Sequence, residues 1–94
     1  MHEQIAREAF VTALQNSRTI PCGLIDIEEV SASRTHGGMF ICSVKRDSIA
    51  ALGNVRVSRP VDGRWTANVH FAAIGIKHSS AAYVSVWGNL PAES

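Results

Sequence analysis

The sequence lacks the cysteine patterns that indicate metal or redox sites and the long apolar runs that indicate membrane spans. Its two cysteines, Cys22 and Cys42, have no second cysteine or histidine beside them at the spacing of a metal-binding motif, which excludes a zinc motif and a CxxC redox pair. The longest uninterrupted apolar run, Phe71 to Ile76, is far shorter than the roughly 20 residues of a membrane-spanning helix. We therefore expect two buried free thiols and no membrane span.

A secretory signal is missing as well. Glu3 and Arg7 carry charge near the start of the chain, and no apolar stretch of roughly 7 to 15 residues follows them. The sequence therefore predicts a cytoplasmic protein, in which a disulfide is not expected.

Signatures of catalysis are also absent. The sequence holds no nucleophile elbow, no phosphate-cradling glycine loop and no recognisable carboxylate pair. His36, His70 and His78 are spread over an expected turn, strand and loop, so their spacing does not favour a metal site. We expect no catalytic residue, no metal and no cofactor.

The composition is that of a chain that can form a core. The chain has 94 residues, of which 46% are hydrophobic and 18% charged, so we expect one globular domain over residues 1–94. The net charge is +1, but residues 1–33 hold five acids and two bases, whereas residues 34–94 hold three acids and seven bases. The excess is too small to mark a nucleic-acid protein by itself, yet it is sufficient for a local anion site.

Apolar residues spaced three and four positions apart predict an amphipathic helix over about residues 3–16. They are Ile5, Ala6, Ala9, Phe10, Ala13 and Leu14. Glu3 and Arg7 lie one turn apart, so their opposite charges stabilise the helix. The helix is expected to end before Ile20-Pro21, because the residue before proline avoids the helical region.

The rest of the sequence predicts five short strands joined by tight turns. The expected strands run over Leu24 to Arg34, Met39 to Val44, Val55 to Ser58, Trp65 to Phe71 and Ala81 to Trp87. The first has a possible bulge at its acidic cluster, Asp26, Glu28 and Glu29, whose charges would protect a sheet edge. Thr35 to Gly38 is an expected hairpin turn, and Asp47 is an expected cap for a helical turn from Ser48 to Leu52.

These elements predict an α+β fold. One N-terminal amphipathic helix packs on a five-stranded, mainly antiparallel and curved sheet, with a short helical turn between the second and third strands.

The hairpin over residues 54–71 carries the clearest candidate binding site. Alternation places polar side chains on one face of it, with two further arginines near the Pro60 to Gly63 turn. The candidate ligand-binding residues are Arg56, Arg59, Arg64, Asn68 and His70. Guanidinium, amide and imidazole groups together suit a phosphate, a nucleotide, a nucleic acid or an acidic protein surface. The alternative is that they form only the solvated side of a half-buried sheet.

Apolar residues also occur on both faces of two expected strands, Met39 to Val44 and Ala81 to Trp87. A helix of about 14 residues is roughly 21 Å long and 10 Å wide, whereas five strands span about 24 Å, so one helix leaves apolar sheet surface uncovered. Such patches usually mark an interface, most often between identical subunits. The candidate interface residues are Phe40, Tyr83, Val84 and Trp87.

The segment Val61-Asp62-Gly63-Arg64-Trp65 resembles hairpins of the NTF2-like cone-shaped folds, and the resemblance covers this segment alone.

The sequence as a whole leads to three functional hypotheses. The first is a non-enzymatic, oligomeric interaction module that binds an anionic ligand or an acidic protein, a description that fits accessory and inhibitor proteins of phages and mobile elements. The second is a small cone-shaped enzyme or ligand-binding pocket that uses His70. The third is a purely structural homo-oligomer.

Overall fold

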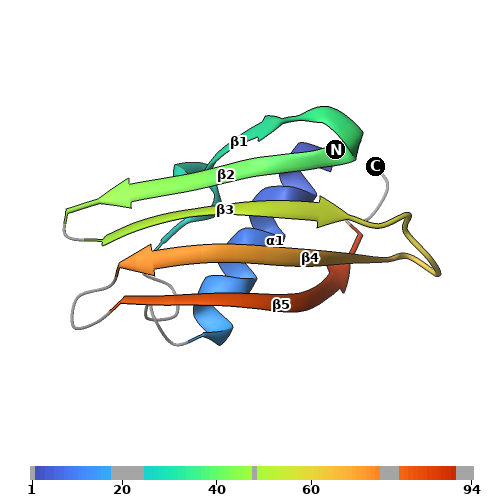
Figure 1. The fold of residues 1–94 in the computed structure, drawn as a ribbon. Helices are drawn as coiled ribbons and strands as arrows, with labels where there is room; N and C mark the ends of the chain where they lie inside the picture. The colour runs from blue at the N-terminus through green and yellow to red at the C-terminus, as the bar shows by residue number, and fades with distance from the viewer. Residues whose placement is uncertain (1, 18–24, 48, 75–78, 91–94) are drawn as a thin grey trace.

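The fold is one helix on an open antiparallel sheet (Figure 1). The computed structural model describes residues 2–17, 25–47, 49–74 and 79–90. Helix α1 (His2–Asn16) lies on one face of strands β1 (Ser31–Arg34), β2 (Met39–Arg46), β3 (Ile49–Val57), β4 (Arg64–Ile74) and β5 (Ser79–Asn89). The strands are adjacent in chain order, each antiparallel to the next. The predicted fold class is therefore confirmed.

Helix α1 follows the predicted period closely. All six residues that predicted it are buried, and three of them are alanines, which let the helix approach the sheet. Its Phe10 lies over Gly53 of β3, where a β-carbon would come within 3.0 Å of the Phe10 ring and 2.6 Å of the His70 carbonyl oxygen. Glycine at position 53 is thus required, because a β-carbon would collide with the neighbouring strand β4 as well as with the Phe10 ring of α1.

The face of the sheet under α1 forms the core. Alternate residues of each strand point towards the helix, as the twofold repeat of a strand requires. The buried residues are Phe40, Cys42 and Val44 of β2, Ile49, Ala51 and Val55 of β3, Trp65, Ala67, Val69, Phe71 and Ala73 of β4, and Val86 of β5. The residues between them form the opposite face, which no described element covers.

The segment before β1 differs from the expected long strand. Ile27–Glu29 is a 3-10 turn, and β1 has only four residues. The turn closes on itself, because the Glu29 backbone N–H donates to the Asp26 carbonyl oxygen and the Asp26 N–H donates to Glu29 Oε1. These local hydrogen bonds compete with strand pairing. The expectation of a strand from Leu24 to Arg34 is therefore wrong over residues 25–30 and correct over residues 31–34. Leu24 lies outside the described residues.

The structure also places the short helical turns elsewhere than expected. Ile49–Leu52 begin β3 rather than a helical turn, and Asp47 lies in the β2–β3 connection with φ of 53°. The buried alternation of Ile49, Ala51 and Val55 continues the register with β2, so strand pairing outweighs the capping tendency of Asp47. The second 3-10 turn is His36–Gly38, between β1 and β2, at the predicted glycine turn. Ser48 lies outside the described residues.

Among the described residues, every helix falls short of the length and apolar content that a membrane crossing requires.

Candidate functional site

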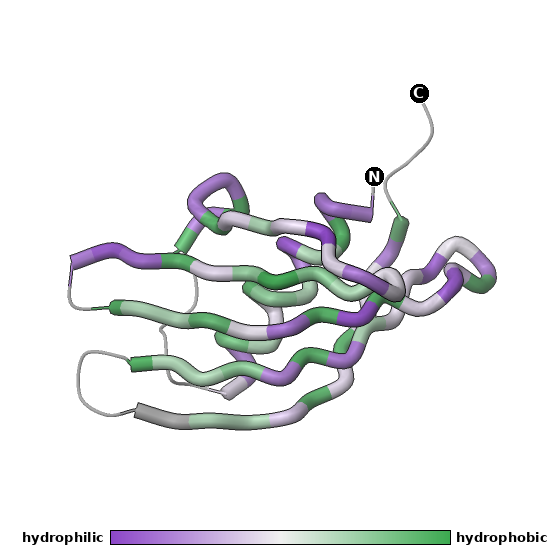
Figure 2. The backbone as a smooth tube through the Cα atoms, turned by 45° about the horizontal axis from the view of Figure 1, so that its top comes forward, coloured by the Kyte–Doolittle hydropathy of each residue, from purple (hydrophilic) through white to green (hydrophobic). Residues whose placement is uncertain are grey.

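The open face of the sheet, the side opposite α1, divides into a polar end and an apolar end. Towards the β3–β4 turn, strands β3 and β4 alternate between hydrophilic and hydrophobic segments, whereas towards their other ends they are mainly hydrophobic (Figure 2). Two cross-strand rows make up the polar end. One row is Met39, Arg56, Asn68 and Ser85, and the other is Asn54, His70 and Tyr83. The β2 partner of Asn54 is Ile41, an apolar residue at the border with the apolar end.

A hollow of about 200 Å³ lies on the polar end and gathers three of the predicted ligand-binding residues. It is lined by Met39, Asn54, Arg56, Asn68, His70 and Tyr83. Arg56 and His70 come from neighbouring strands, and both side chains are exposed. The hollow is therefore open to solvent and rich in hydrogen-bond donors.

Hydrogen bonds and ring contacts orient the groups of this hollow. Ser85 Oγ donates to Asn68 Oδ1 at 2.7 Å, which directs the amide oxygen to β5. Arg56 Nη1 donates to the Gly37 carbonyl oxygen at 3.4 Å, a long bond that leaves most of the guanidinium donors available. The His70 ring meets the Tyr83 ring edge-on, with centroids 5.9 Å apart and an interplanar angle of 61°.

The other two predicted ligand-binding residues, Arg59 and Arg64, lie at the β3–β4 turn. They line a separate hollow of about 290 Å³ together with Val61, Asp62 and Thr66. The structure therefore divides the five candidate ligand-binding residues between two hollows, because Arg59 and Arg64 lie at the turn and not along the polar rows. The two hollows are neighbours, since Thr66 and Asn68 are two residues apart on β4, about 7 Å.

Arg64 packs on an aromatic ring of the neighbouring strand. Its guanidinium carbon lies 4.8 Å from the centroid of the Trp87 ring, a cation–π geometry. Trp87 is 58% exposed and pairs in register with Thr66. The turn end of the open face thus presents a stacked arginine and tryptophan.

The predicted interface residues are divided between the two faces of the sheet. Tyr83 and Trp87 belong to the open face and are exposed, whereas Phe40 is 2% exposed beneath α1 and Val84 is partly buried on the same side. Parity along each strand explains the division, because Phe40 pairs with the buried Val55 and Val84 with the buried Val69. Phe40 is thus a core residue and is not presented to a partner.

The sequence interpretation missed the apolar end of the open face. Its large exposed side chains are Ile41, Leu52 and Ile74, which are 43%, 60% and 58% exposed, and small alanines surround them. Leu52 was assigned to a helical turn, which hid its place in the strand alternation. The alternation of Ile49, Ala51, Gly53 and Val55 is the signal that identifies β3 and places Leu52 on the open face.

Charge is separated between the two layers. Among the described strand residues, the open face carries arginine, lysine and histidine but no carboxylate. The acidic residues of the helical layer are Glu3, Glu8, Asp26, Glu28 and Glu29. The two remaining described acids, Asp47 and Asp62, lie in turns. An anion that approaches the sheet therefore meets an electropositive surface.

A groove larger than either hollow lies between α1 and the end of β5, and it reaches Trp87 at the edge of the open face. It has a volume of about 490 Å³, and Glu8, Asp26 and Glu28 contribute acid groups to its lining. Within the described ranges, no group of three or more His, Cys, Asp or Glu residues is arranged to hold a metal ion. The groove is acidic and gives no independent indication of a ligand.

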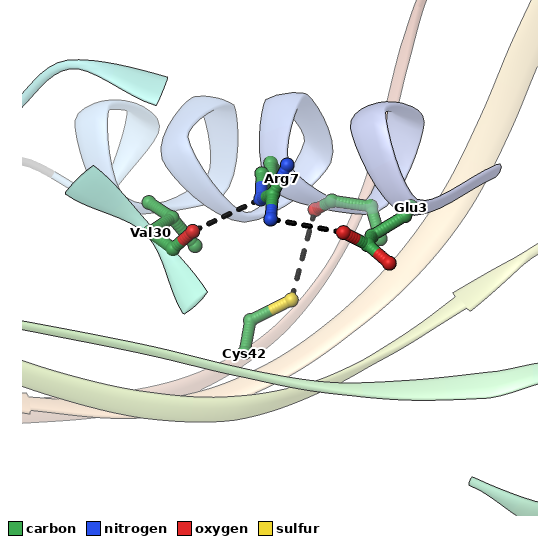
Figure 3. Close-up of polar contacts among 5 residues, drawn as sticks. Glu3, Arg7, Val30 and Cys42 are labelled. Carbon is green, nitrogen blue, oxygen red and sulfur yellow. Dashed lines mark hydrogen bonds and ion pairs between the residues drawn. The ribbon is translucent and has the colours of Figure 1, made fainter. Parts of the chain in front are cut away.

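Cys42 is unreactive in this fold. Its side chain is fully buried, and Sγ donates to the Ala6 carbonyl oxygen of α1 at 3.9 Å (Figure 3). Burial raises the pKa of this thiol from 9.0 to about 11, although the charge of nearby Arg7 lowers it in part. The thiol is protonated at neutral pH and is not a nucleophile. The expectation of a buried free thiol is confirmed at Cys42, and Cys22 lies outside the described residues.

Arg7 itself is committed to the fold. It donates from Nη2 to Glu3 Oε1 at 2.9 Å and from Nε to the Val30 carbonyl oxygen at 3.0 Å (Figure 3). The first contact is the predicted pair within the helix, and the second ties α1 to the start of β1. Arg7 is therefore a structural residue of the helical layer.

Comparisons with protein-family models, with curated proteins and with solved structures each found no match to this chain. Of the features above, the open face alone combines convergent donors, exposed aromatic rings and charge of one sign.

Proposed function

We propose that the protein is a non-enzymatic binding module that holds an anionic ligand on the polar end of its open sheet face. The observation that carries the proposal is the hollow in which Arg56, Asn68 and His70 meet without a carboxylate. Arginine supplies a permanent charge and a planar fork of donors, which suits phosphate and carboxylate oxygens. A cytoplasmic accessory or inhibitory protein that occupies such a ligand is the role this module fits.

The alternative is a small enzyme, or a ligand-binding pocket, that uses His70. A general base needs a reacting group and an orienting partner within hydrogen-bond reach. The His70 ring instead lies against Tyr83 on an exposed surface, and the hollow has neither a carboxylate nor a nucleophilic thiol in its lining. This environment supports ligand binding over catalysis.

The test is an NMR titration of the full chain with pyrophosphate, a small anion with no base or peptide part. We expect amide shifts concentrated at residues 54–56, 66–70 and 83–85 in the wild type and their loss in Arg56→Gln. Arg34→Gln is the matched control because it removes the same charge from β1, where Arg34 lies over the core residue Phe40. If pyrophosphate shifts no amide at these positions, or if both variants weaken binding equally, the proposal is wrong.

The apolar end of the open face supports the second part of the proposal, that the chain associates with a second copy of itself. Ile41, Leu52 and Ile74 form an exposed apolar group on adjacent strands. Two such faces packed about a twofold axis would bury this group against itself. An offset pairing at this end leaves the polar end free for a ligand.

Light scattering at micromolar concentration tests the self-association. We expect a mass at least twice that of the 10.1 kDa chain, which falls to the monomer value in Leu52→Lys and Ile74→Lys. Val61→Lys is the matched control, since Val61 is 64% exposed but lies at the opposite end of β3, in the turn to β4. A monomeric wild type, or an equal loss of mass in Val61→Lys, would contradict the pairing through this patch.

A further inference from the structure

Two aromatic side chains stand exposed on the open face, both from β5. Tyr83 is 66% exposed and Trp87 is 58% exposed. They lie on the same side of the strand and four residues apart, a separation of about 13 Å. Exposed rings of this size offer flat apolar surfaces to a planar ligand.

Each ring is paired with a basic side chain of β4. His70 meets Tyr83 with ring centroids 5.9 Å apart, and the Arg64 guanidinium lies 4.8 Å from the Trp87 centroid. The same aromatic-plus-basic unit therefore occurs twice along the seam between β4 and β5. The Asn68 and Ser85 pair lies between the two units, in register with both strands.

This repeat matches the chemistry of an unpaired nucleic-acid strand, whose bases alternate with phosphates. Bases stack on aromatic rings or guanidinium planes, whatever their sequence, while arginine and lysine neutralise the phosphates. The amides of Asn54 and Asn68 add donors and acceptors that can bond to base edges. A duplex hides the faces of its bases, so it would not use exposed rings in this way.

The charge distribution agrees with such a ligand. The net charge of +1 understates the open face, because five described acids belong to the helical layer and none to the open face of the described strands. An acidic protein surface would also be attracted to Arg56 and Arg64. The regular alternation of rings and basic groups along one seam, however, is the arrangement that a strand of alternating bases and phosphates requires.

We infer that the anionic ligand of the open face is a single-stranded nucleic acid, whose bases stack on Tyr83 and Trp87 while Arg56 and Arg64 contact its phosphates. This inference rests on the function proposed above and names the class of ligand. The juxtaposition that carries it is the pair of aromatic-plus-basic units, His70 with Tyr83 and Arg64 with Trp87, on a face whose described strand residues include no carboxylate. Within the described ranges, this face has carboxylates only at its borders, where Asp62 lines the turn hollow with Arg64 and the acidic groove reaches Trp87.

The experiment measures the binding of the full chain to a fluorescein-labelled 12-nucleotide oligothymidylate by fluorescence anisotropy. We expect Tyr83→Ala and Trp87→Ala each to raise the Kd at least about fivefold, the lower end of the loss measured for one stacked base. His2→Ala is the matched control because it removes an exposed ring from α1, in the other layer, and it should change the Kd less than twofold. Melting curves confirm that each variant is folded.

Three further probes separate the possible ligands. An abasic strand of the same length should bind at least about fivefold more weakly than oligothymidylate, because it keeps the phosphates but not the stacking. Oligoglutamate should compete poorly. Stacking should also change the fluorescence of the exposed Trp87, whereas Trp65 is 3% exposed and should contribute little change.

The outcomes distinguish this inference from the function on which it rests. If the abasic strand binds as tightly as oligothymidylate and the aromatic variants bind normally, the stacking inference is overturned while an anion site remains. If oligoglutamate binds more tightly than the oligonucleotide, the partner is an acidic protein, and the inference is again overturned. If pyrophosphate shifts the expected amides but the oligonucleotide does not bind, only the inference fails. If none of the anions binds, both proposals fail.

Discussion

The covered face and the open face of the sheet are built from alternate residues of the same strands, yet they have different compositions. The covered face presents apolar side chains almost without exception, and α1 buries them. The open face mixes arginine, asparagine and histidine with exposed aromatic and aliphatic residues. Neighbouring residues of one strand point to opposite faces, so one of them contributes to the stability of the core while the next is available for binding. Substitutions that differ by one position should therefore have very different effects.

The largest effect is expected from leucine truncations on the two sides of the sheet. Leu14 is 1% exposed between α1 and the sheet, whereas Leu52 is 60% exposed on the open face. Leu14→Ala should lower the free energy of unfolding by about 2 to 5 kcal/mol, as buried leucine truncations do, and Leu52→Ala should change that of the monomer by less than about 0.5 kcal/mol. Thermal and urea unfolding at a concentration low enough to exclude association measure both values.

This comparison would break if the two variants melted within a degree or two of each other. In that case α1 would not be docked on the sheet as described.

The next effect comes from adding a methyl group beneath α1. In Gly53→Ala, the new β-carbon would lie 2.6 Å from the His70 carbonyl oxygen and 2.8 Å from Phe71 Cβ. Backbone must move to relieve these contacts, so we expect a loss of about 2 to 3 kcal/mol, within the range for overpacked cores.

The matched control for Gly53→Ala is Ala72→Val. Ala72 pairs with Leu52 on the exposed side of β4, so the added methyl groups should change stability by less than about 0.5 kcal/mol. Equal urea midpoints for the two variants would mean that β4 and α1 leave room for a β-carbon at position 53.

The covered face was easier to predict from the sequence than the open face, and the reason is physical. The helix period identified six of the seven residues that α1 buries, all but Val11. The alternation in the 54–71 hairpin placed Arg56, Asn68 and His70 on one face. Burial of one face produces a periodic pattern of apolar residues within a single helix or strand, so the buried face can be predicted from that segment alone. Tyr83 and Asn54 join the hollow only through cross-strand register, which no single strand encodes.

Two errors show where local signals compete. Aspartate is a favoured helix-capping residue, so Asp47 indicated a helical turn after it. In the structure, Ile49 pairs with Arg46 and extends the β2–β3 hairpin, so residues 49–52 belong to strand β3. Phe40 was placed at an interface because both faces of β2 are apolar, and parity could not be assigned without its partner Val55. The first of these errors also placed Leu52 in a helical turn, whereas it is a strand residue that is 60% exposed on the open face.

A smaller effect should appear only at high pH, through the buried thiol of the covered face. Burial raises the pKa of Cys42 to about 11 in the folded chain, against 9.0 for an ordinary thiol. Between these values the unfolded chain binds fewer protons than the folded one. The contribution of the protonated thiol is therefore fully present below pH 9 and is lost as the pH rises to about 11. The loss should be on the order of 2 kcal/mol.

The measurement compares urea midpoints of the wild type and Cys42→Ala between pH 8 and about 11. Other groups titrate in both proteins and cancel, so the difference between them should narrow as the pH rises. A constant difference across this range would mean that the thiol is solvated or ionised in the folded state.

The smallest change in stability should accompany the largest change in binding, in the charge reversal Arg56→Glu. Arg56 is exposed, and its hydrogen bond to the Gly37 carbonyl oxygen is 3.4 Å long, so the free energy of unfolding should change by less than about 0.5 kcal/mol. A carboxylate in the hollow with Asn68 and His70 would repel an anion, so pyrophosphate should no longer shift the amides there. Wild-type binding should also weaken as salt is added, because ions screen exposed charges over roughly 8 to 10 Å.

Arg34→Glu applies the same charge change on β1 and should leave pyrophosphate binding near the wild-type value. If Arg56→Glu binds as the wild type does, or loses binding only because it unfolds, the open face is a solvated surface and the separation between the two faces does not extend to function.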